Sequence, residues 1–284
     1  MDYYIVIPIH NEEAYLKSTL DSICTQSLLP KKVILVNDNS TDGTEEIIDT
    51  YCSKNHIFQK LNFISSKEHM PGSKVINAFN RGLEVLDADY DMLVKLDADI
   101  ILPANYFKSI STHLSNDPQI GICGGFIYER NDKGEWALHH PMDKNHVRGA
   151  FKAYSKSCFK AIGGLRNAMG WDTVDELLSK YHGFIVHTDP SLKIKHLRPT
   201  GKAYNPKAKR LQGKAMYSMR YGFTITCIAS IKMALKNKSF NSFWNNMKGF
   251  MEAARTNKPF LVNEEEGRFI RNLRWTNIKR KITP

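Results

Sequence analysis

The N-terminal third of the chain alternates short apolar runs with segments of helical periodicity. Alternation of this kind is typical of βαβ units, whose strands form a largely parallel sheet covered by helices. The pattern therefore predicts an α/β domain of the Rossmann-like class. The expected strands are 3–9, 32–36, 58–64 and 92–96, and the expected helices are 12–24, 44–52 and 73–86.

The character of the chain changes at about residue 202, where clear strand patterns end. The segment 209–236 has the pattern of a partly amphipathic helical region. Residues 202–284 contain 18 Lys and Arg against 4 Glu and no Asp, whereas the whole chain has a net charge of +11. We therefore expect two parts, an α/β domain over 1–201 and a basic, mainly helical C-terminal extension over 202–284.

Composition excludes several classes of protein. With 42% hydrophobic and 11% aromatic residues, the chain can bury a large core, which argues against disorder. No run approaches the ~20 apolar residues that span a bilayer, and the N-terminus does not resemble a signal peptide, so we expect a cytoplasmic location. The five cysteines lack paired spacing, which argues against a disulfide framework or a zinc site.

Polar residues follow three of the expected strands, in the segments 8–13, 36–44 and 96–100. In open α/β sheets, ligands bind beyond the carboxyl ends of the strands. We therefore expect a functional site where these three segments meet.

The segment 96–100 offers two carboxylates, Asp97 and Asp99, separated by one residue. In extended chain, side chains at positions i and i+2 point to the same side, so both carboxylates could bind one divalent cation that bridges a diphosphate. The alternative is a solvated turn, because Asp is common in turns.

The segment 36–44 runs from a strand into a helix. Capping of that helix accounts for Asp42 and Thr44 but not for Asp38, whose carboxylate could accept a hydrogen bond from a nucleobase N–H. The segment 8–13 is open to two interpretations in the same way, because Asn11 and the glutamates after it also suit a helix start.

Together these segments resemble the family 2 glycosyltransferases over roughly residues 3–200. The resemblance implies a GT-A fold with a mixed, mostly parallel sheet, in which about 1–100 bind the nucleotide-sugar and about 101–201 form the acceptor side. Its motifs here are PIHNEE (8–13), VNDNSTDGT (36–44), PGSKVINAFNRGL (71–83), LDADI (96–100), RGAFKAYSKSCFKAIGG (148–164), GWDTVDELLSKYHG (170–183) and KHLRPTG (195–201).

The resemblance also implies roles for individual residues. Asp97 and Asp99 would contact ribose and Mn²⁺ or Mg²⁺, and His196 is a candidate third metal ligand, although a histidine at a strand end can also be structural. Charge alone suggests Lys74, Arg148, Arg198 and Lys202 as diphosphate partners. The expected nucleotide-binding residues are Pro8, His10, Asn11, Glu12, Asp38, Ser40, Lys74, Asp97 and Ala98.

The general base implied by the family alignment is Asp172, with Asp175 as the reserve. The family pattern usually has Glu before this Asp, whereas Trp171 stands there in this chain. Without the resemblance, Asp172 could simply cap the helix that follows it.

The expected activity is inverting transfer of a sugar from a nucleotide-diphosphate sugar, expected to be a UDP-sugar, to a glycan or lipid-linked acceptor in polysaccharide biosynthesis. One alternative is a metal-dependent nucleotidyltransferase, but the segment 8–13 lacks the Gly-rich basic loop of that class. The other is a nucleic-acid-binding protein, suggested by a pI of about 9.3. No binding module is recognisable and the positive charge lies outside the catalytic part, so we expect no nucleic-acid partner.

The basic C-terminal part suggests peripheral contact with the inner face of a membrane. Arg210, Lys214, Arg220, Lys232 and Lys236 flank the apolar run FTITCIASI (223–231), a composition suited to interfacial attachment. The alternative is a solvated helical lid on the catalytic domain.

Overall fold

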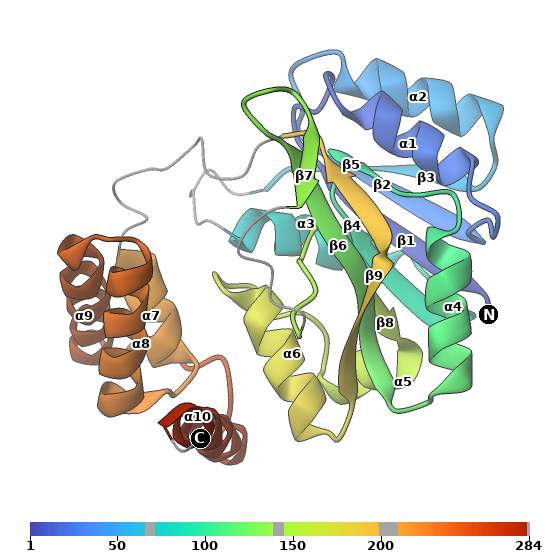
Figure 1. Cartoon of the computed structure of the whole chain (residues 1–284). Coiled ribbons are helices and arrows are strands. Elements are labelled where there is room, and N and C mark those ends of the chain that lie inside the picture. Colours follow the sequence, from blue (N-terminus) through green and yellow to red (C-terminus); the bar gives the residue numbers. More distant parts are fainter. Residues whose placement is uncertain (66–71, 139–144, 199–209, 283–284) are drawn as a thin grey trace.

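The computed structural model describes residues 1–65, 72–138, 145–198 and 210–282. A nine-stranded sheet in the order β3-β2-β1-β4-β8-β6-β9-β5 organises the α/β part, and β7 pairs with β6 (Figure 1). The strands are β1 (Tyr3–Ile9), β2 (Lys32–Asp38), β3 (Phe58–Phe63), β4 (Met92–Leu96), β5 (Ile100–Ile101), β6 (Ile120–Arg130), β7 (Trp136–Leu138), β8 (Phe151–Ser155) and β9 (Ile185–His196).

The sheet is mixed, as expected. Strands β3, β2, β1 and β4 are parallel, β8 is antiparallel to both β4 and β6, and β9 is parallel to β6. The four parallel strands are those that the N-terminal alternation predicted, and β1 and β4 have the predicted bounds. Nearly every side chain of β1 and β4 is buried, because helices cover a parallel sheet on both faces.

In the ranges that the structure describes, six helices pack on this sheet. Helix α3 lies so close to β1 that a Cβ added to Gly82 would be 2.4 Å from Val6. The predicted helix 12–24 begins only at Leu16, because Glu12 to Tyr15 form a turn. These helices are α1 (Leu16–Cys24), α2 (Thr44–Lys54), α3 (Ser73–Glu84), α4 (Tyr106–Asn116), α5 (Lys156–Ala161) and α6 (Trp171–Tyr181).

The C-terminal helices form a group beside the α/β part (Figure 1). From residue 210 on, the predicted helical segment 209–236 divides into two helices, because Arg220 has a left-handed φ of 54°. No helix in the described part of the chain is long and apolar enough to cross a bilayer. The helices of this group are α7 (Leu211–Ser218), α8 (Gly222–Lys236), α9 (Phe240–Arg255) and α10 (Glu264–Ile282).

The helical group packs on the α/β part near the N-terminus of α6. A Cβ on Gly170, which precedes α6, would lie 3.7 Å from Ala215 of α7. Arg166 donates a hydrogen bond from Nε to the Leu261 carbonyl oxygen at 3.2 Å. One buried apolar cluster includes Trp171 of α6 and Met216 of α7. The two parts therefore share a core.

Candidate functional site

The site lies at the edge of the sheet where β1, β2 and β4 end. These strands are neighbours and parallel, so their carboxyl ends meet at one edge. The three polar segments singled out in the sequence leave the sheet there.

The loops after β1 and β2 are joined by hydrogen bonds between their backbones and side chains. Ser40 Oγ accepts from the Asn11 N–H at 3.0 Å, and Asn11 Oδ1 accepts from the Thr41 N–H at 2.8 Å. Asn11 has a left-handed φ of 54°, which Asn tolerates better than most residues. Asn11 and Ser40 thus shape the loops rather than line the pocket described next.

A pocket of about 190 Å³ lies between these loops and α3. Asp38 is buried at its edge and accepts the Ser65 N–H at 2.8 Å. His10 Nδ1 lies 2.6 Å from the Asp38 carbonyl oxygen, so Nδ1 carries the proton. Five expected nucleotide-binding residues are among the lining residues, which are Pro8, Ile9, His10, Glu12, Asp38, Lys74, Val75 and Ala78.

Asp97, Ala98 and Asp99 form a turn after β4. Thr19 Oγ1 of α1 donates to the Ala98 carbonyl oxygen at 2.6 Å, and the Asp97 N–H donates to the Ala150 carbonyl oxygen at 2.8 Å. The expectation of extended chain was therefore wrong, because bonds to two distant segments hold the backbone in a turn.

The two carboxylates consequently have different partners. Asp97 forms an ion pair with Lys95, whose side chain is buried in β4. Asp99 Oδ2 lies 3.4 Å from His196 Nε2 and 3.8 Å from Arg198 Nε. The structure thus brings together Asp99 and His196, two of the three expected metal ligands, while Asp97 is held by a lysine.

Glu12 lies within the same charged group. Its carboxylate pairs with Arg198 at 2.5 Å, and its side chain is only 12% exposed. Burial raises the pKa of Glu12 to about 7; Arg198 lowers this pKa, and the Asp99 and Asp97 carboxylates raise it. Glu12 therefore links the pocket to the Asp97–Asp99 turn.

The chemistry of Asp99 and His196 suits a divalent cation, since a carboxylate oxygen and an imidazole nitrogen face each other. Glu129 Oε1 lies 3.1 Å from the other ring nitrogen of His196, which orients the ring. Burial lowers the pKa of His196, but the Asp99 and Glu129 carboxylates outweigh it and raise this pKa overall. Within the described residues, no group of three His, Cys, Asp or Glu side chains that could hold a metal ion is present.

Asp172 and Asp175 differ sharply in environment although both belong to α6. Asp172 lies in the first turn, half-buried, with its Cβ 3.2 Å from where a Cβ on Gly149 would be. Gly149 precedes Ala150, the residue that binds Asp97, so Asp172 adjoins the same edge.

Asp175 is fully buried, and its carboxylate is hydrogen-bonded to neighbouring side chains. Its carboxylate accepts from Lys152 at 2.8 and 3.0 Å and from the Tyr154 hydroxyl at 2.6 Å. Burial raises the pKa of Asp175 to about 6, although Lys152 lowers it. Asp175 therefore stabilises the packing of α6 on β8 and has no surface on which to meet a substrate.

Buried lysines of the site were not anticipated from the sequence. The ammonium groups of Lys95 and Lys152 lie 5.3 and 5.8 Å from the ring centroid of Trp171. A lysine inside an apolar strand pattern, as in MLVKL (92–96), was the available signal. Trp171, which directly precedes Asp172 in the sequence, therefore packs against the ammonium groups of Lys95 and Lys152.

The remaining diphosphate candidates separate by position. Lys74 lines the pocket and Arg198 pairs with Glu12 and Asp99. Arg148 lies in the segment before Gly149, while Lys202 lies outside the described residues.

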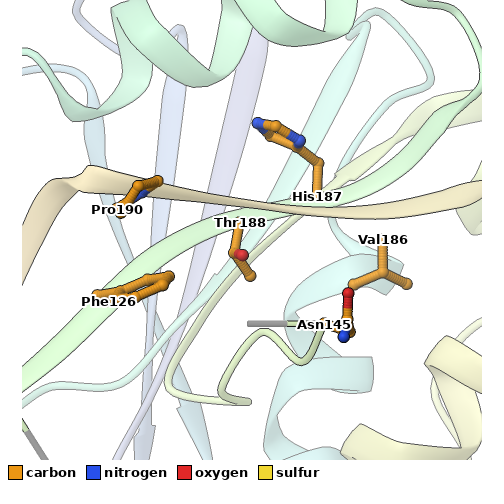
Figure 2. A pocket seen from close by; sticks show the side chains of 6 residues that line it. All are labelled: Phe126, Asn145, Val186, His187, Thr188 and Pro190. Atoms are coloured by element: carbon orange, nitrogen blue, oxygen red, sulfur yellow. The ribbon is translucent and has the colours of Figure 1, made fainter. Parts of the chain in front are cut away.

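A second pocket, of about 280 Å³, lies on β6 and the first part of β9. Figure 2 shows Val186 and Thr188 pointing to the side of Phe126 and Asn145, while His187 points the opposite way. Its lining residues include none of the expected site residues, since His196 is at the far end of β9.

Comparison with known proteins gives a family match. The protein-family model described as "Glycosyl transferase family 2" matches residues 4–170 of this chain. A poly-beta-1,6-N-acetyl-D-glucosamine synthase of Staphylococcus epidermidis is 25% identical over 185 residues, which cover 59% of this chain and 41% of that protein. The chain therefore corresponds to less than half the length of this relative.

Solved glycosyltransferases share the fold. Residues 1–349 of TarS from S. aureus in complex with UDP-GlcNAc give a TM-score of 0.57 at 16% identity, covering 78% of this chain and 65% of that one. The mannosyltransferase PcManGT from Pyrobaculum calidifontis, in complex with GDP-Man and Mn²⁺, gives 0.57 at 15% identity, covering 94% and 78%. These similarities establish a GT-A glycosyltransferase fold.

Proposed function

Because this chain belongs to glycosyl transferase family 2, we propose that it transfers a sugar from a UDP-sugar to an acceptor hydroxyl, with inversion, in the synthesis of a glycan or polysaccharide. The proposal rests on one observation, a pocket whose lining residues include Pro8, His10, Glu12, Asp38 and Lys74. Glu12 connects this pocket to the group formed by Asp97, Asp99 and His196. Similarity to the poly-beta-1,6-N-acetyl-D-glucosamine synthase and to TarS, solved in complex with UDP-GlcNAc, supports a UDP-sugar donor.

In this proposal the pocket binds the nucleotide. Asp38 accepts an N–H of the base, and Lys74 lies where its ammonium can bind a phosphate oxygen. Asp99 and His196 would hold Mn²⁺ or Mg²⁺, with Asp97 beside them. When bound, the ion would neutralise negative charge on the diphosphate leaving group.

Asp172 acts as the general base. The acceptor hydroxyl oxygen attacks the anomeric carbon while the bond from that carbon to the diphosphate oxygen breaks, and its electron pair leaves with the nucleotide. Asp172 takes the hydroxyl proton, so configuration inverts in one displacement. Asp175 cannot serve, because Lys152 and Tyr154 already bind its carboxylate.

The test separates donor binding from proton transfer. We expect Asp172→Asn to lower transfer, followed as nucleotide release from UDP-sugars, by about 10²–10⁴-fold with unchanged nucleotide affinity. Asp99→Asn should lower transfer and also remove the effect of Mn²⁺ on nucleotide affinity, measured by calorimetry.

The matched control is Asp132→Asn, in the exposed turn between β6 and β7, which should change neither quantity. Full transfer by Asp172→Asn, or equal loss of nucleotide affinity in both site variants, would contradict the proposed roles.

A further inference from the structure

Helices α8 and α9 form a hairpin with an apolar tip. Away from the tip, the rings of Phe223 in α8 and Phe250 in α9 pack together, with centroids 6.4 Å apart. At the tip, Lys238 turns the chain with a left-handed φ of 48°, and its N–H bonds the Leu235 carbonyl oxygen. We define the hairpin tip as residues 231–244.

Four large apolar side chains of the hairpin tip face solvent. Leu235 is 75% exposed, Phe240 70%, Trp244 48% and Ile231 47%. The rings of Phe240, Phe243 and Trp244 contact one another, with centroids 5.5 to 6.1 Å apart. Clustered exposed apolar side chains of this kind mark an interaction surface.

The run FTITCIASI (223–231), which the sequence suggested as the attachment segment, contributes only its last residue, Ile231, to this surface. Ile225, Thr226 and Ser230 are buried. Arg210 and Lys214 pair with Glu252, and the Arg220 guanidinium lies 3.7 Å from the Phe260 ring centroid. Helix packing thus uses the centre of the run and three of its flanking cations.

The charge around the hairpin tip has one sign. Lys236 and Lys238 are exposed on the tip, and Lys248 follows one turn after Trp244. These three lysines form no ion pair within the described residues, and the sequence contains no Asp or Glu from 202 to 251. A second copy of the chain would place like charges against each other, whereas an anionic lipid surface complements them.

From this arrangement we propose that the hairpin tip docks on an anionic membrane surface. Phe240, Trp244 and Leu235 insert at the level of the headgroups, where aromatic rings are favoured, and Lys236 and Lys238 bind lipid phosphates. Docking does not depend on the proposed transferase activity.

The experiment is co-sedimentation of the full chain with phosphatidylcholine vesicles containing about 30% phosphatidylglycerol, and with pure phosphatidylcholine vesicles. We expect binding to the anionic vesicles that weakens with salt, and a blue shift of tryptophan fluorescence that Trp244→Phe removes. Leu235→Ser with Phe240→Ser should lower the partition coefficient by about tenfold or more, and Lys236→Glu with Lys238→Glu should remove the preference for anionic lipid.

The controls are Leu29→Ser, at an apolar side chain 53% exposed in the α/β part, and Lys54→Glu, at the exposed end of α2. Both should bind vesicles like the unchanged chain, and far-UV circular dichroism checks the folding of every variant. Three results would overturn the proposal: no binding to anionic vesicles at low salt, equal binding by tip and control variants, or self-association through the tip without vesicle binding.

Discussion

At the scale of single residues, the two aspartates of α6 show how burial assigns roles. Asp172 and Asp175 are one helical turn apart, so sequence periodicity could not separate them. In the structure Asp175 forms a buried group with Lys152, Tyr154 and Glu176, whose carboxylate lies 3.1 Å from Lys152. A buried charge is tolerated only when it is paired, so this group constrains how α6 packs.

We predict that Asp175→Asn lowers the free energy of unfolding by about 3–5 kcal/mol, because it leaves Lys152 buried with one carboxylate. Urea denaturation measures the change. The double variant Asp175→Asn with Lys152→Met should recover part of the loss, because removing both charges also removes their desolvation cost.

Asp132→Asn serves as the exposed reference and should change the free energy of unfolding by less than about 0.5 kcal/mol. If Asp175→Asn were as stable as this reference, the buried group would not be formed as described.

At the scale of elements, α7 and α9 cross with their backbones in close contact. A Cβ added to Gly213 would lie 1.8 Å from the Asn246 carbonyl oxygen, and one added to Gly249 would lie 2.1 Å from that of Arg210. The two backbones touch where glycine leaves room. The sequence predicted the helices here, but a glycine in a helical pattern did not reveal its partner.

We predict that Gly213→Ala lowers the free energy of unfolding by about 3 kcal/mol, because a rigid backbone cannot move aside for the added methyl group. The measurement is again urea denaturation, with hydrogen exchange of α7 and α9 to locate the effect.

The matched variant is Gly134→Ala, where no atom lies within 4 Å but φ is +80°. Only backbone strain acts there, so the expected loss is about 1–2 kcal/mol. A smaller loss at Gly213 than at Gly134 would show that the helices do not cross so closely.

At the scale of the whole molecule, the distribution of charge separates the chain into two parts, whereas the packing of the core joins them. The positive charge is concentrated in residues 202–284. The buried core is nevertheless continuous from Trp171 to Met216 and Ile270. The boundary proposed at 201 and 202 lies outside the described residues and stays a prediction.

We predict that both parts unfold in one transition, because separating them would expose shared core. In Trp244→Phe with Trp275→Phe, fluorescence reports Trp136 and Trp171 of the α/β part, while far-UV circular dichroism also reports the helices. Their thermal midpoints should coincide. Two separate midpoints would mean that the helical group folds as an independent unit.

From the sequence alone it was possible to predict the parallel strands, the three polar segments that follow them and the family. Strand patterns are local and strongly apolar, so β1 and β4 could be bounded without knowledge of any contact. Chain order also placed Asp38 and the Asp97–Asp99 segment at one edge of the sheet, because parallel strands share their carboxyl edge.

The partners of these side chains depend on long-range contacts and could not be predicted from the sequence. Thr19 and Ala150 hold Asp97 and Asp99 in a turn, Lys95 binds one carboxylate, and His196 faces the other. These partners come from segments far apart in the chain, and no local pattern encodes such a contact. Burial of Asp175 and exposure of the hairpin tip were decided in the same way, by what the rest of the fold covers.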